Sequence, residues 1–431
     1  MNRFYIWTIG CQMNKADSLN LSAELERMGY RPVSTPEEAD IVVLNSCVVR
    51  QSAEDKVVNK LTNLKALKKT HPGVFIALTG CMVNSGTNRL KERFEHVDAF
   101  FKPQQFRDLL SRIETRSEPG PWSPARAALE SVTAYIPIIQ GCNNFCSYCI
   151  VPYRRGREKS RPMAEIIREI VQYIECGIRE ITLLGQNVDS YGHDLPDRPD
   201  LADLLTEVNQ IDGLERIRFL TSHPKDMSRK LIEAVASLER VCEHISLPAQ
   251  AGDNEILQAM RRGYTIEQYV ALIGRIRETI PHVALSNDII VGFPGETAAQ
   301  FGRTYDLLQK LQFDAVHVAA YSPRPGTIAS RKLKDNVSAE EKQDRLKRIE
   351  VLQESISRGI NHRLVNRKVE VLVEGKKGTR WQGRTRGDKL VFFEDHGDWY
   401  GKLAQVNVTH AGAWSLQGTP LIESAMVAGT K

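Results

Sequence analysis

The first hundred residues alternate between short apolar runs and amphipathic stretches. The runs at residues 4–9, 41–45 and 74–79 are apolar and partly β-branched, which is typical of parallel strands buried on both faces. Residues 17–28 and 52–69 lie between them with helical periodicity, and Asp17 and Ser52 are in position to cap these helices. We therefore predict an open parallel βα sheet in an N-terminal domain of residues 1–118.

A proline-rich segment ends this domain. Pro119, Pro121 and Pro124 fall within a few residues of each other, which is too many for a helix. We expect a linker at residues 119–131.

The strand–helix alternation then resumes over a longer span. Candidate strands lie at residues 135–140, 180–187, 216–222, 243–250, 284–292 and 314–321, with helical patterns between them. Six successive βα units predict an α/β fold related to an incomplete (βα)6 barrel at residues 132–361, closed by a charged helix near residues 338–358.

The pattern changes again near residue 366. Residues 368–374, 389–393 and 403–409 alternate or are β-branched, with glycines between them. They predict a small all-β barrel at residues 362–427.

Composition supports a globular protein with several domains. The chain has 431 residues, of which 42% are hydrophobic and 26% are charged. No apolar run approaches the ~18 residues of a membrane span, and the N-terminus lacks the features of a signal peptide. We expect a cytoplasmic protein without membrane contact. Its eight cysteines should be reduced there, so their spacing points to metal or redox chemistry.

The net charge is only +5, but positive charge is concentrated in one place. Residues 376–389 hold six basic residues and one acid, a local excess that indicates an anionic polymer as partner. We expect an RNA-binding hairpin, in which an exposed tryptophan can stack on a base: Lys376, Lys377, Arg380, Trp381, Arg384 and Arg386. The alternative is a solvated hairpin with Trp381 tucked into its own barrel.

Three cysteines follow the first strand of the central domain. Cys142, Cys146 and Cys149 have C-x3-C-x2-C spacing, and no fourth ligand for a closed zinc site lies nearby. Three thiolates suit a four-iron cluster with one open iron. Such an iron can chelate S-adenosylmethionine and deliver one electron to it. A degenerate zinc loop is the alternative.

Three further cysteines lie at equivalent positions in the predicted N-terminal sheet. Cys11, Cys47 and Cys81 each follow one of the predicted N-terminal strands, and the carboxyl ends of parallel strands lie along one edge of a sheet. We predict that the fold gathers them around a second iron–sulfur cluster. The alternative is three unrelated buried cysteines.

Other polar and turn residues at the predicted strand ends are candidates for S-adenosylmethionine contacts, although each can equally be turn chemistry: Gly185, Gln186, Asn187, Pro248, Gln250, Gly292 and Pro294. Residues 154–161 carry five basic side chains, most of them expected to be solvated. Delivery of one electron to S-adenosylmethionine begins radical chemistry. We name no catalytic acid or base, because abstraction of a hydrogen atom by a radical needs none.

With these sites in place, the sequence resembles the methylthiotransferases of the radical S-adenosylmethionine superfamily over nearly its whole length. The matching motifs are residues 10–14 (GCQMN), 45–50 (NSCVVR), 80–82 (GCM) and 140–161. Within this family, the chain most resembles the branch that modifies isopentenyl-adenosine in tRNA.

The resemblance implies a transferase with two [4Fe-4S] clusters and S-adenosylmethionine as cofactors. One cluster, held by Cys142, Cys146 and Cys149, would generate a 5′-deoxyadenosyl radical. The other, held by Cys11, Cys47 and Cys81, would carry sulfur. The implied reaction adds a methylthio group at C2 of isopentenyl-adenosine next to the anticodon, with a second S-adenosylmethionine as methyl donor. The implied partners are the tRNA anticodon stem-loop and an external electron donor of the flavodoxin type, and the protein is expected to be a monomer. The C-terminal barrel resembles a TRAM domain.

Two alternatives stay open. Sister branches of the family modify threonylcarbamoyl-adenosine in tRNA or an aspartate of a ribosomal protein, but usually have Pro-Lys or Lys-Val where this chain has Gln12-Met13. A zinc-bearing RNA-binding protein without catalysis is the alternative from another class.

Overall fold

Five parallel strands form the N-terminal sheet of the computed structural model, which describes residues 2–48, 51–83, 88–113 and 122–421. In the order β2-β1-β3-β4-β5, they are Arg31–Pro32, Arg3–Thr8, Ile41–Ser46, Phe75–Gly80 and Ala99–Phe100. The two main helices are α1 (Gln12–Arg27) and α2 (Gln51–Thr70), and the short helices α3 (Asn88–Arg93) and α4 (Phe106–Leu110) follow. The predicted parallel sheet is confirmed.

The predicted helix starts are wrong. Helix α1 begins directly after Cys11, five residues earlier than expected, so Asp17 lies inside the helix and caps nothing. Helix α2 begins at Gln51, one residue before Ser52. Residues 49 and 50 of the cysteine motif lie outside the described residues.

The central domain is an open arc of six parallel strands. They are β6 (Thr133–Pro137), β9 (Glu180–Leu184), β10 (Arg216–Phe219), β11 (His244–Ser246), β12 (Ala284–Val291) and β13 (Ala315–Ala320). They form two three-stranded sheets, joined by a bridge between Ile217 and Val241. The predicted partial (βα)6 barrel is confirmed.

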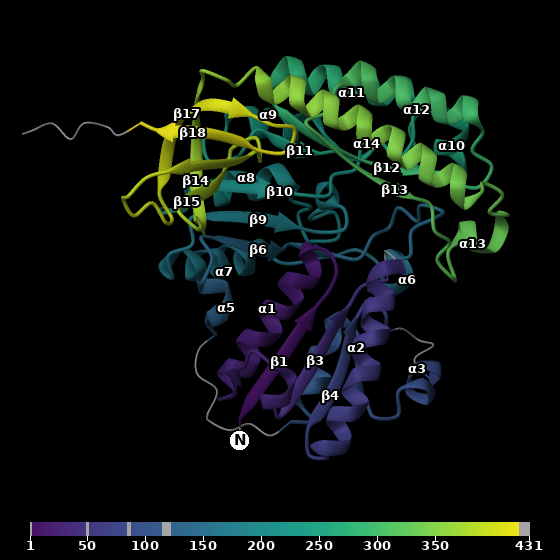
Figure 1. Cartoon of the computed structure of the whole chain (residues 1–431), viewed down its shortest axis with the longest axis vertical. Coiled ribbons are helices and arrows are strands. Elements are labelled where there is room, and N and C mark those ends of the chain that lie inside the picture. Colours follow the sequence, from purple (N-terminus) through teal and green to yellow (C-terminus); the bar gives the residue numbers. More distant parts are fainter. Residues whose placement is uncertain (1, 49–50, 84–87, 114–121, 422–431) are drawn as a thin grey trace, which may run out of the picture.

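Helices cover the outside of this arc (Figure 1). They are α7 (Met163–Glu175), α8 (Leu201–Val208), α9 (Arg229–Ser237), α11 (Ile266–Thr279), α12 (Ala298–Leu311) and the long α14 (Ala339–His362). Helices α8, α11 and α12 each start with a capping box, which satisfies backbone N–H groups that a helix start leaves unpaired. Shorter elements are α6 (Val151–Arg155), α10 (Asn254–Ala259), α13 (Ile328–Lys332) and the antiparallel strand pair β7 (Ile139–Gln140) and β8 (Lys159–Ser160).

The expected linker contains one helical turn. Helix α5 covers Arg126–Leu129, beyond the last proline of the segment, while residues 119–121 lie outside the described part of the chain.

Five strands close the C-terminal barrel: β14 (Lys368–Lys377), β15 (Arg380–Thr385), β16 (Leu390–Glu394), β17 (Leu403–Ala411) and β18 (Leu416–Pro420). This confirms the predicted small all-β barrel. It lies against the amino ends of the central strands, at the opposite end from α6 (Figure 1). Two buried arginines make the junction: Arg216 donates to the carbonyl of Arg384, and Arg218 donates to the carbonyls of Thr385 and Arg386.

The N-terminal domain packs on the other end of the arc. Met13 and Ala16 of α1 form an apolar cluster with Leu184 at the end of β9. The carboxyl edges of the N-terminal sheet and of the central arc therefore meet, between α1 and α6 (Figure 1).

Two adjoining cysteine sites and the C-terminal hairpin

Cys11, Cys47 and Cys81 lie at the carboxyl edge of the N-terminal sheet. Strands β1, β3 and β4 pair in parallel register, with Thr8 opposite Asn45 and Asn45 opposite Thr79. Because the strands end level, the cysteines that follow them are brought to one edge.

Two glycines permit this convergence. Gly10 has a φ of 142°, and a Cβ there would lie 2.8 Å from the Cβ of Cys47. Gly80 has a φ of 94°, and a Cβ there would overlap the carbonyl oxygen of Ser46. Only glycine fits at such positions without displacing the backbone.

The buried side-chain amides of Asn14 and Asn45 hold the carboxyl edge of the N-terminal sheet in place. Asn14 donates to Asn45 Oδ1 at 2.9 Å and to the carbonyl of Ser46, and Asn45 donates back to the carbonyl of Asn14. The thiol of Cys11 lies 3.3 Å from Asn14 Oδ1. Asn14 thereby links the first cysteine to the strand that carries the second.

The thiol of Cys81 is buried beside an arginine. Burial raises the pKa of Cys81 to about 11; the Arg155 guanidinium, which hydrogen-bonds this thiol, opposes the rise, while Cys47 and Cys11 add to it. These influences place the three sulfur atoms and Arg155 within electrostatic reach of each other.

The central triad lies in a loop after β7 that the rest of the domain holds firmly. Gln186 accepts from the backbone of Gly141 at 2.6 Å, and Gly156 accepts from the backbone of Cys142. Ser147 donates to the carbonyl of Ala259 and accepts, through its own carbonyl, from Ala329. Contacts from both ends of the arc thus shape this loop.

The thiols of this loop are largely buried. Burial raises the pKa of Cys142 to about 11 and that of Cys149 to about 12, and neighbouring thiols of the loop add to both shifts. The buried Arg262 lies 3.5 Å from the sulfur of Cys146 and donates to the carbonyl of Pro248. An arginine therefore accompanies each cysteine triad.

The two triads adjoin each other. Ile150, directly after Cys149, packs into the same apolar cluster as Cys81 and Met82. Arg155, at the end of α6, forms a buried ion pair with Asp17 at 2.8 Å. The helix that follows one triad therefore ends at the other.

The two cysteine triads have the donor atoms that iron–sulfur clusters require, but their side chains are not gathered closely enough to hold a single metal ion. Among the described residues, no group of three His, Cys, Asp or Glu side chains is placed to hold a single metal ion. Each triad offers three soft sulfur donors, which suit iron–sulfur assembly. Ligation by these cysteines stays a prediction.

The predicted cofactor residues do not form one uniform set. Gln186 supports the cysteine loop, and Pro248 accepts from Arg262. A Cβ at Gly185 would approach Ile139, and one at Gly292 would overlap Lys342 of α14, so packing explains both glycines. Gln250 has a φ of 73° and pairs with Ile289, and Pro294 lies buried in the turn after Gly292.

Several buried polar atoms near the carboxyl ends of the central strands have no partner within the described chain. Asn187 donates to Asp226, but its Oδ1 is unpaired. The same holds for His223 Nε2 and Asn287 Nδ2. Buried polar groups are normally satisfied, so these atoms suit a polar cofactor such as S-adenosylmethionine. Contacts to that cofactor remain predictions.

Sequence reasoning missed three residues here. Asp189, Asn287 and Arg262 are buried at this end of the arc. Burial raises the pKa of Asp189 to about 7, against the hydrogen bonds from Ser222 and the His223 backbone. Asp189 follows a predicted strand end by two residues and could have been included, whereas Arg262 reaches Cys146 only through the fold.

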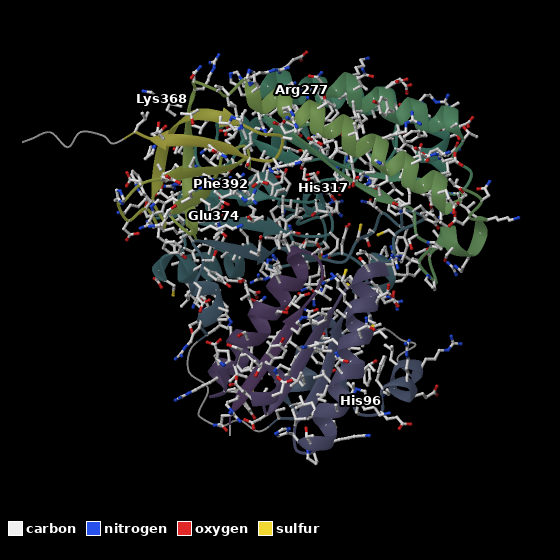
Figure 2. All side chains as sticks on the ribbon, in the orientation of Figure 1. His96, Arg277, His317, Lys368, Glu374 and Phe392 are labelled. Carbon is white, nitrogen blue, oxygen red and sulfur yellow. The ribbon has the colours of Figure 1, made fainter. Side chains whose placement is uncertain are left out.

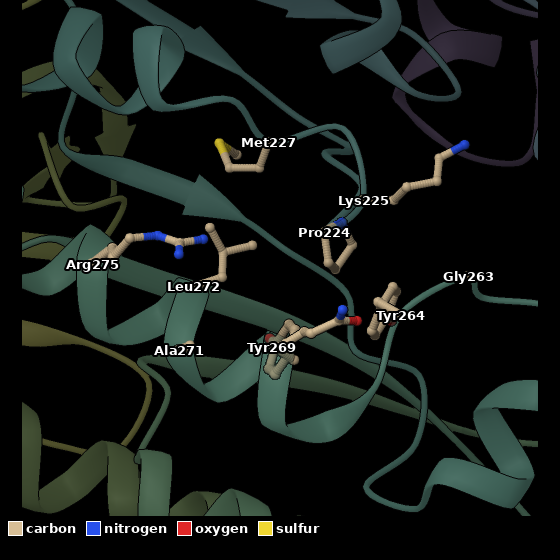
Figure 3. A pocket seen from close by; sticks show the side chains of 10 residues that line it. Pro224, Lys225, Met227, Gly263, Tyr264, Tyr269, Ala271, Leu272 and Arg275 are labelled. Atoms are coloured by element: carbon tan, nitrogen blue, oxygen red, sulfur yellow. The ribbon is translucent and has the colours of Figure 1, made fainter.

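A surface hollow of about 450 Å³ lies beside this site (Figure 3). Lys225 on its rim donates to Asn144 of the cysteine loop at 2.6 Å, and Tyr264 packs edge-on against His223. The hollow is lined by Pro224, Lys225, Met227, Gly263, Tyr264, Gln268, Tyr269, Ala271, Leu272 and Arg275. It adjoins the cysteine loop from outside.

The C-terminal hairpin differs from the prediction. Trp381 points into the barrel core, is 6% exposed and donates to the carbonyl of Asp395, so its proposed stacking on RNA is wrong. Arg386 forms an ion pair with Glu243 of the central domain, and Arg384 pairs with Asp388. Lys376, Lys377 and Arg380 are exposed, and Lys376 lies over the Trp381 ring.

Three family models match successive parts of the chain. Residues 3–102 match the uncharacterized protein family UPF0004, residues 136–308 match the radical SAM superfamily, and residues 362–421 match the TRAM domain.

Curated relatives match along nearly the whole length. A tRNA-2-methylthio-N(6)-dimethylallyladenosine synthase of Dehalococcoides mccartyi is 51% identical over 417 residues, which are 97% of this chain and 98% of the relative. A synthase with the same name from a Roseiflexus species is 49% identical, over 96% of this chain and 89% of the relative. The chain belongs to the tRNA-2-methylthio-N(6)-dimethylallyladenosine synthase family. It is therefore a radical SAM transferase of the methylthiotransferase class, as the resemblance implied.

Solved structures share the fold. The radical S-adenosylmethionine methyltransferase TsrM of Kitasatospora setae, solved with cobalamin and a [4Fe-4S] cluster, has a TM-score of 0.56 at 14% identity, over 77% of each chain. OxsB, a cobalamin-dependent radical enzyme, has a TM-score of 0.53 at 11% identity, over 82% of this chain and 56% of its own. In the described part of the chain, every helix is too short or too polar to cross a bilayer.

Proposed function

We propose that this chain adds a methylthio group to C2 of isopentenyl-adenosine next to the anticodon of tRNA. Dimethylallyl, in the names of the relatives, is the same substituent as isopentenyl. The observation that carries the proposal is that the two cysteine triads adjoin each other. The three cysteines of the first triad each follow one strand of the N-terminal sheet, and those of the second lie within one loop.

Each triad has the right chemistry for its expected group. Cys142, Cys146 and Cys149 would hold the cluster that binds S-adenosylmethionine, and Cys11, Cys47 and Cys81 would hold the auxiliary cluster. When bound, these groups supply radical chemistry and sulfur for a C–H bond that has no leaving group and no acidic proton.

The chain's own residues prepare the site. Burial keeps the metal-free thiols of Cys81, Cys142 and Cys149 protonated at neutral pH. Arg155 and Arg262 lie at one sulfur of each triad and would offset the negative charge that thiolate ligands bring. The loop lies between the two domains, and this position would limit the access of water to the groups that the two triads would hold.

We further propose a reducing environment and two partners for this enzyme. The free cysteines suit a reducing cytoplasm. An external one-electron donor of the flavodoxin type would supply reducing equivalents, and the chain would act as a monomer on the anticodon stem-loop.

Mass spectrometry of tRNA nucleosides tests the function. A strain lacking this gene should accumulate isopentenyl-adenosine without its 2-methylthio form, and the wild-type gene should restore the product. Loss of the methylthio group from threonylcarbamoyl-adenosine, or from a ribosomal-protein aspartate, would instead place the chain in a sister branch.

A further inference from the structure

The hairpin that was expected to stack on RNA presents no free aromatic ring, but another part of the barrel does. Of the five tryptophans, all of which the structure describes, Trp414 is the exposed one, with 63% of its surface accessible. It lies in the turn between β17 and β18.

The backbone of this turn is held in place. Gly412 donates to the carbonyl of Ser415 at 2.9 Å. The buried Asn361, at the end of α14, donates to the carbonyls of Gly412 and Ala413 at 2.9 and 3.0 Å. Since Ala413 is itself buried, the Trp414 ring projects from an ordered support, which lowers the entropy cost of binding through it.

The two chain segments next to the Trp414 turn carry a local excess of positive charge. Residues 355–369 and 403–420 contain Arg358, Arg363, Arg367 and Lys368 and no Asp or Glu. The two segments lie side by side, because Asn366 donates to the carbonyl of Val408. We call Trp414 with Arg363, Arg367 and Lys368 the Trp414 surface.

The cations of this surface are available to a ligand. Arg363, Arg367 and Lys368 are exposed, and none of them forms an ion pair with any residue that the structure describes. Arg358, by contrast, pairs with Glu354 at 2.6 Å. Lys368 points outward from the barrel in Figure 2.

We propose that the Trp414 surface binds tRNA, with Trp414 stacked on an unpaired base and Arg363, Arg367 and Lys368 facing phosphates. An exposed aromatic ring, together with exposed cations that form no ion pair, is the combination that single-stranded nucleic acid recognises. This inference rests on the proposed function and identifies where the substrate's remote part is held.

The location of the surface defines which part of the tRNA it meets. Helix α14 has 24 residues, about 36 Å at 1.5 Å per residue. It begins on the side of α13 (Figure 1), whose Ala329 donates to Ser147 of the cysteine loop, and near its other end Asn361 donates to the backbone of the Trp414 turn. The Trp414 surface therefore contacts nucleotides far from the modified base, outside the anticodon loop.

Binding measurements with two RNAs test this proposal. The probes are a whole tRNA that carries isopentenyl-adenosine and its isolated anticodon stem-loop, titrated against iron-loaded protein. Trp414→Ala should weaken binding of the whole tRNA about 5- to 150-fold and leave stem-loop binding nearly unchanged. Trp414→Phe should retain most of the affinity, and circular dichroism should show that both variants are folded.

A charge-matched pair of double variants adds a second readout. In Arg363→Ala/Arg367→Ala, the logarithm of the tRNA association constant should depend less steeply on the logarithm of the salt concentration. The magnitude of this negative slope should fall by about 1.4–1.8 for whole tRNA. Lys376→Ala/Lys377→Ala removes the same charge from the hairpin and should change the slope less.

The outcomes separate this inference from the function itself. Wild-type protein that fails to bind tRNA would contradict the proposed function. Wild-type binding with unchanged whole-tRNA affinity in Trp414→Ala, or with an equal loss for both RNAs, would overturn the inference alone.

Discussion

Arg155 and Asp17 form a buried ion pair across the boundary between the N-terminal and central domains, 2.8 Å apart, with 2% and 11% of their side chains exposed. Arg155 ends the helix that follows Cys149, and Asp17 lies in the helix that follows Cys11. The pair therefore ties the two cysteine sites together.

Removal of one partner should be costly. Arg155→Met leaves the Asp17 carboxylate buried without its cation and should lower the free energy of unfolding by about 3–5 kcal/mol. Denaturant unfolding of the metal-free protein, followed by tryptophan fluorescence, measures this loss. The double variant Arg155→Met/Asp17→Leu should recover much of it, and a single variant as stable as wild type would contradict this account of the interface.

Gly80 should tolerate no side chain. Gly80→Ala places a Cβ against the Ser46 carbonyl at a φ of 94°, so the cysteine edge must distort. We expect a loss of at least about 2 kcal/mol in the free energy of unfolding. Gly73→Ala is the matched control, because a Cβ there meets no atom within 4 Å. Equal stability of the two variants would show that the edge is not constrained at Gly80.

The junction with the C-terminal barrel depends on Arg218. This buried side chain pairs with Glu180 at 2.9 Å and donates to two barrel carbonyls. Arg218→Met should cost about 3 kcal/mol and should expose the connection after α14 to limited proteolysis. Arg229→Met removes an exposed pair with Glu233 and should cost well under 1 kcal/mol; a similar proteolysis pattern for both variants would refute the role of Arg218.

His244 should make stability depend on pH. Burial lowers the pKa of His244 to about 4 from an ordinary 6.5; Asp388 and Asp314 oppose this shift, while Arg218 and Lys389 act in the same direction as burial. The folded state thus excludes a proton that the unfolded chain binds. The free energy of unfolding is therefore unaffected by His244 above pH 6.5 and falls by about 3 kcal/mol as the pH falls from 6.5 towards 4. Unfolding curves of His244→Gln between pH 7 and 4 should be flatter than those of wild type by this amount; parallel curves would argue against it.

The sequence predicted those features that depend on short patterns. The convergence of three cysteines, each following a strand, could be predicted from the alternation of apolar runs and the geometry of a parallel sheet alone. The loop triad required only spacing. Strands β2 and β5, of two residues each, are too short to leave any periodic signal.

Side chains that act across long sequence distances were not predictable in this way. Asp17 was interpreted as a helix cap because its partner Arg155 is 138 residues away. Arg262 reaches Cys146 over 116 residues. Trp381 is the instructive case: in β15 it alternates inward with Gly383 and Thr385, so strand periodicity could have indicated its burial, but the surrounding charge suggested exposure.

The central claim is that each triad holds its own iron–sulfur cluster. Anaerobically reconstituted wild-type protein should contain roughly eight irons and eight sulfides per chain. The triple variants Cys11→Ala/Cys47→Ala/Cys81→Ala and Cys142→Ala/Cys146→Ala/Cys149→Ala should each contain roughly four. Cys176→Ala/Cys242→Ala, which changes the two cysteines outside the triads, should keep the full content. About four irons in the wild type, or no loss on removal of Cys11, Cys47 and Cys81, would contradict the account.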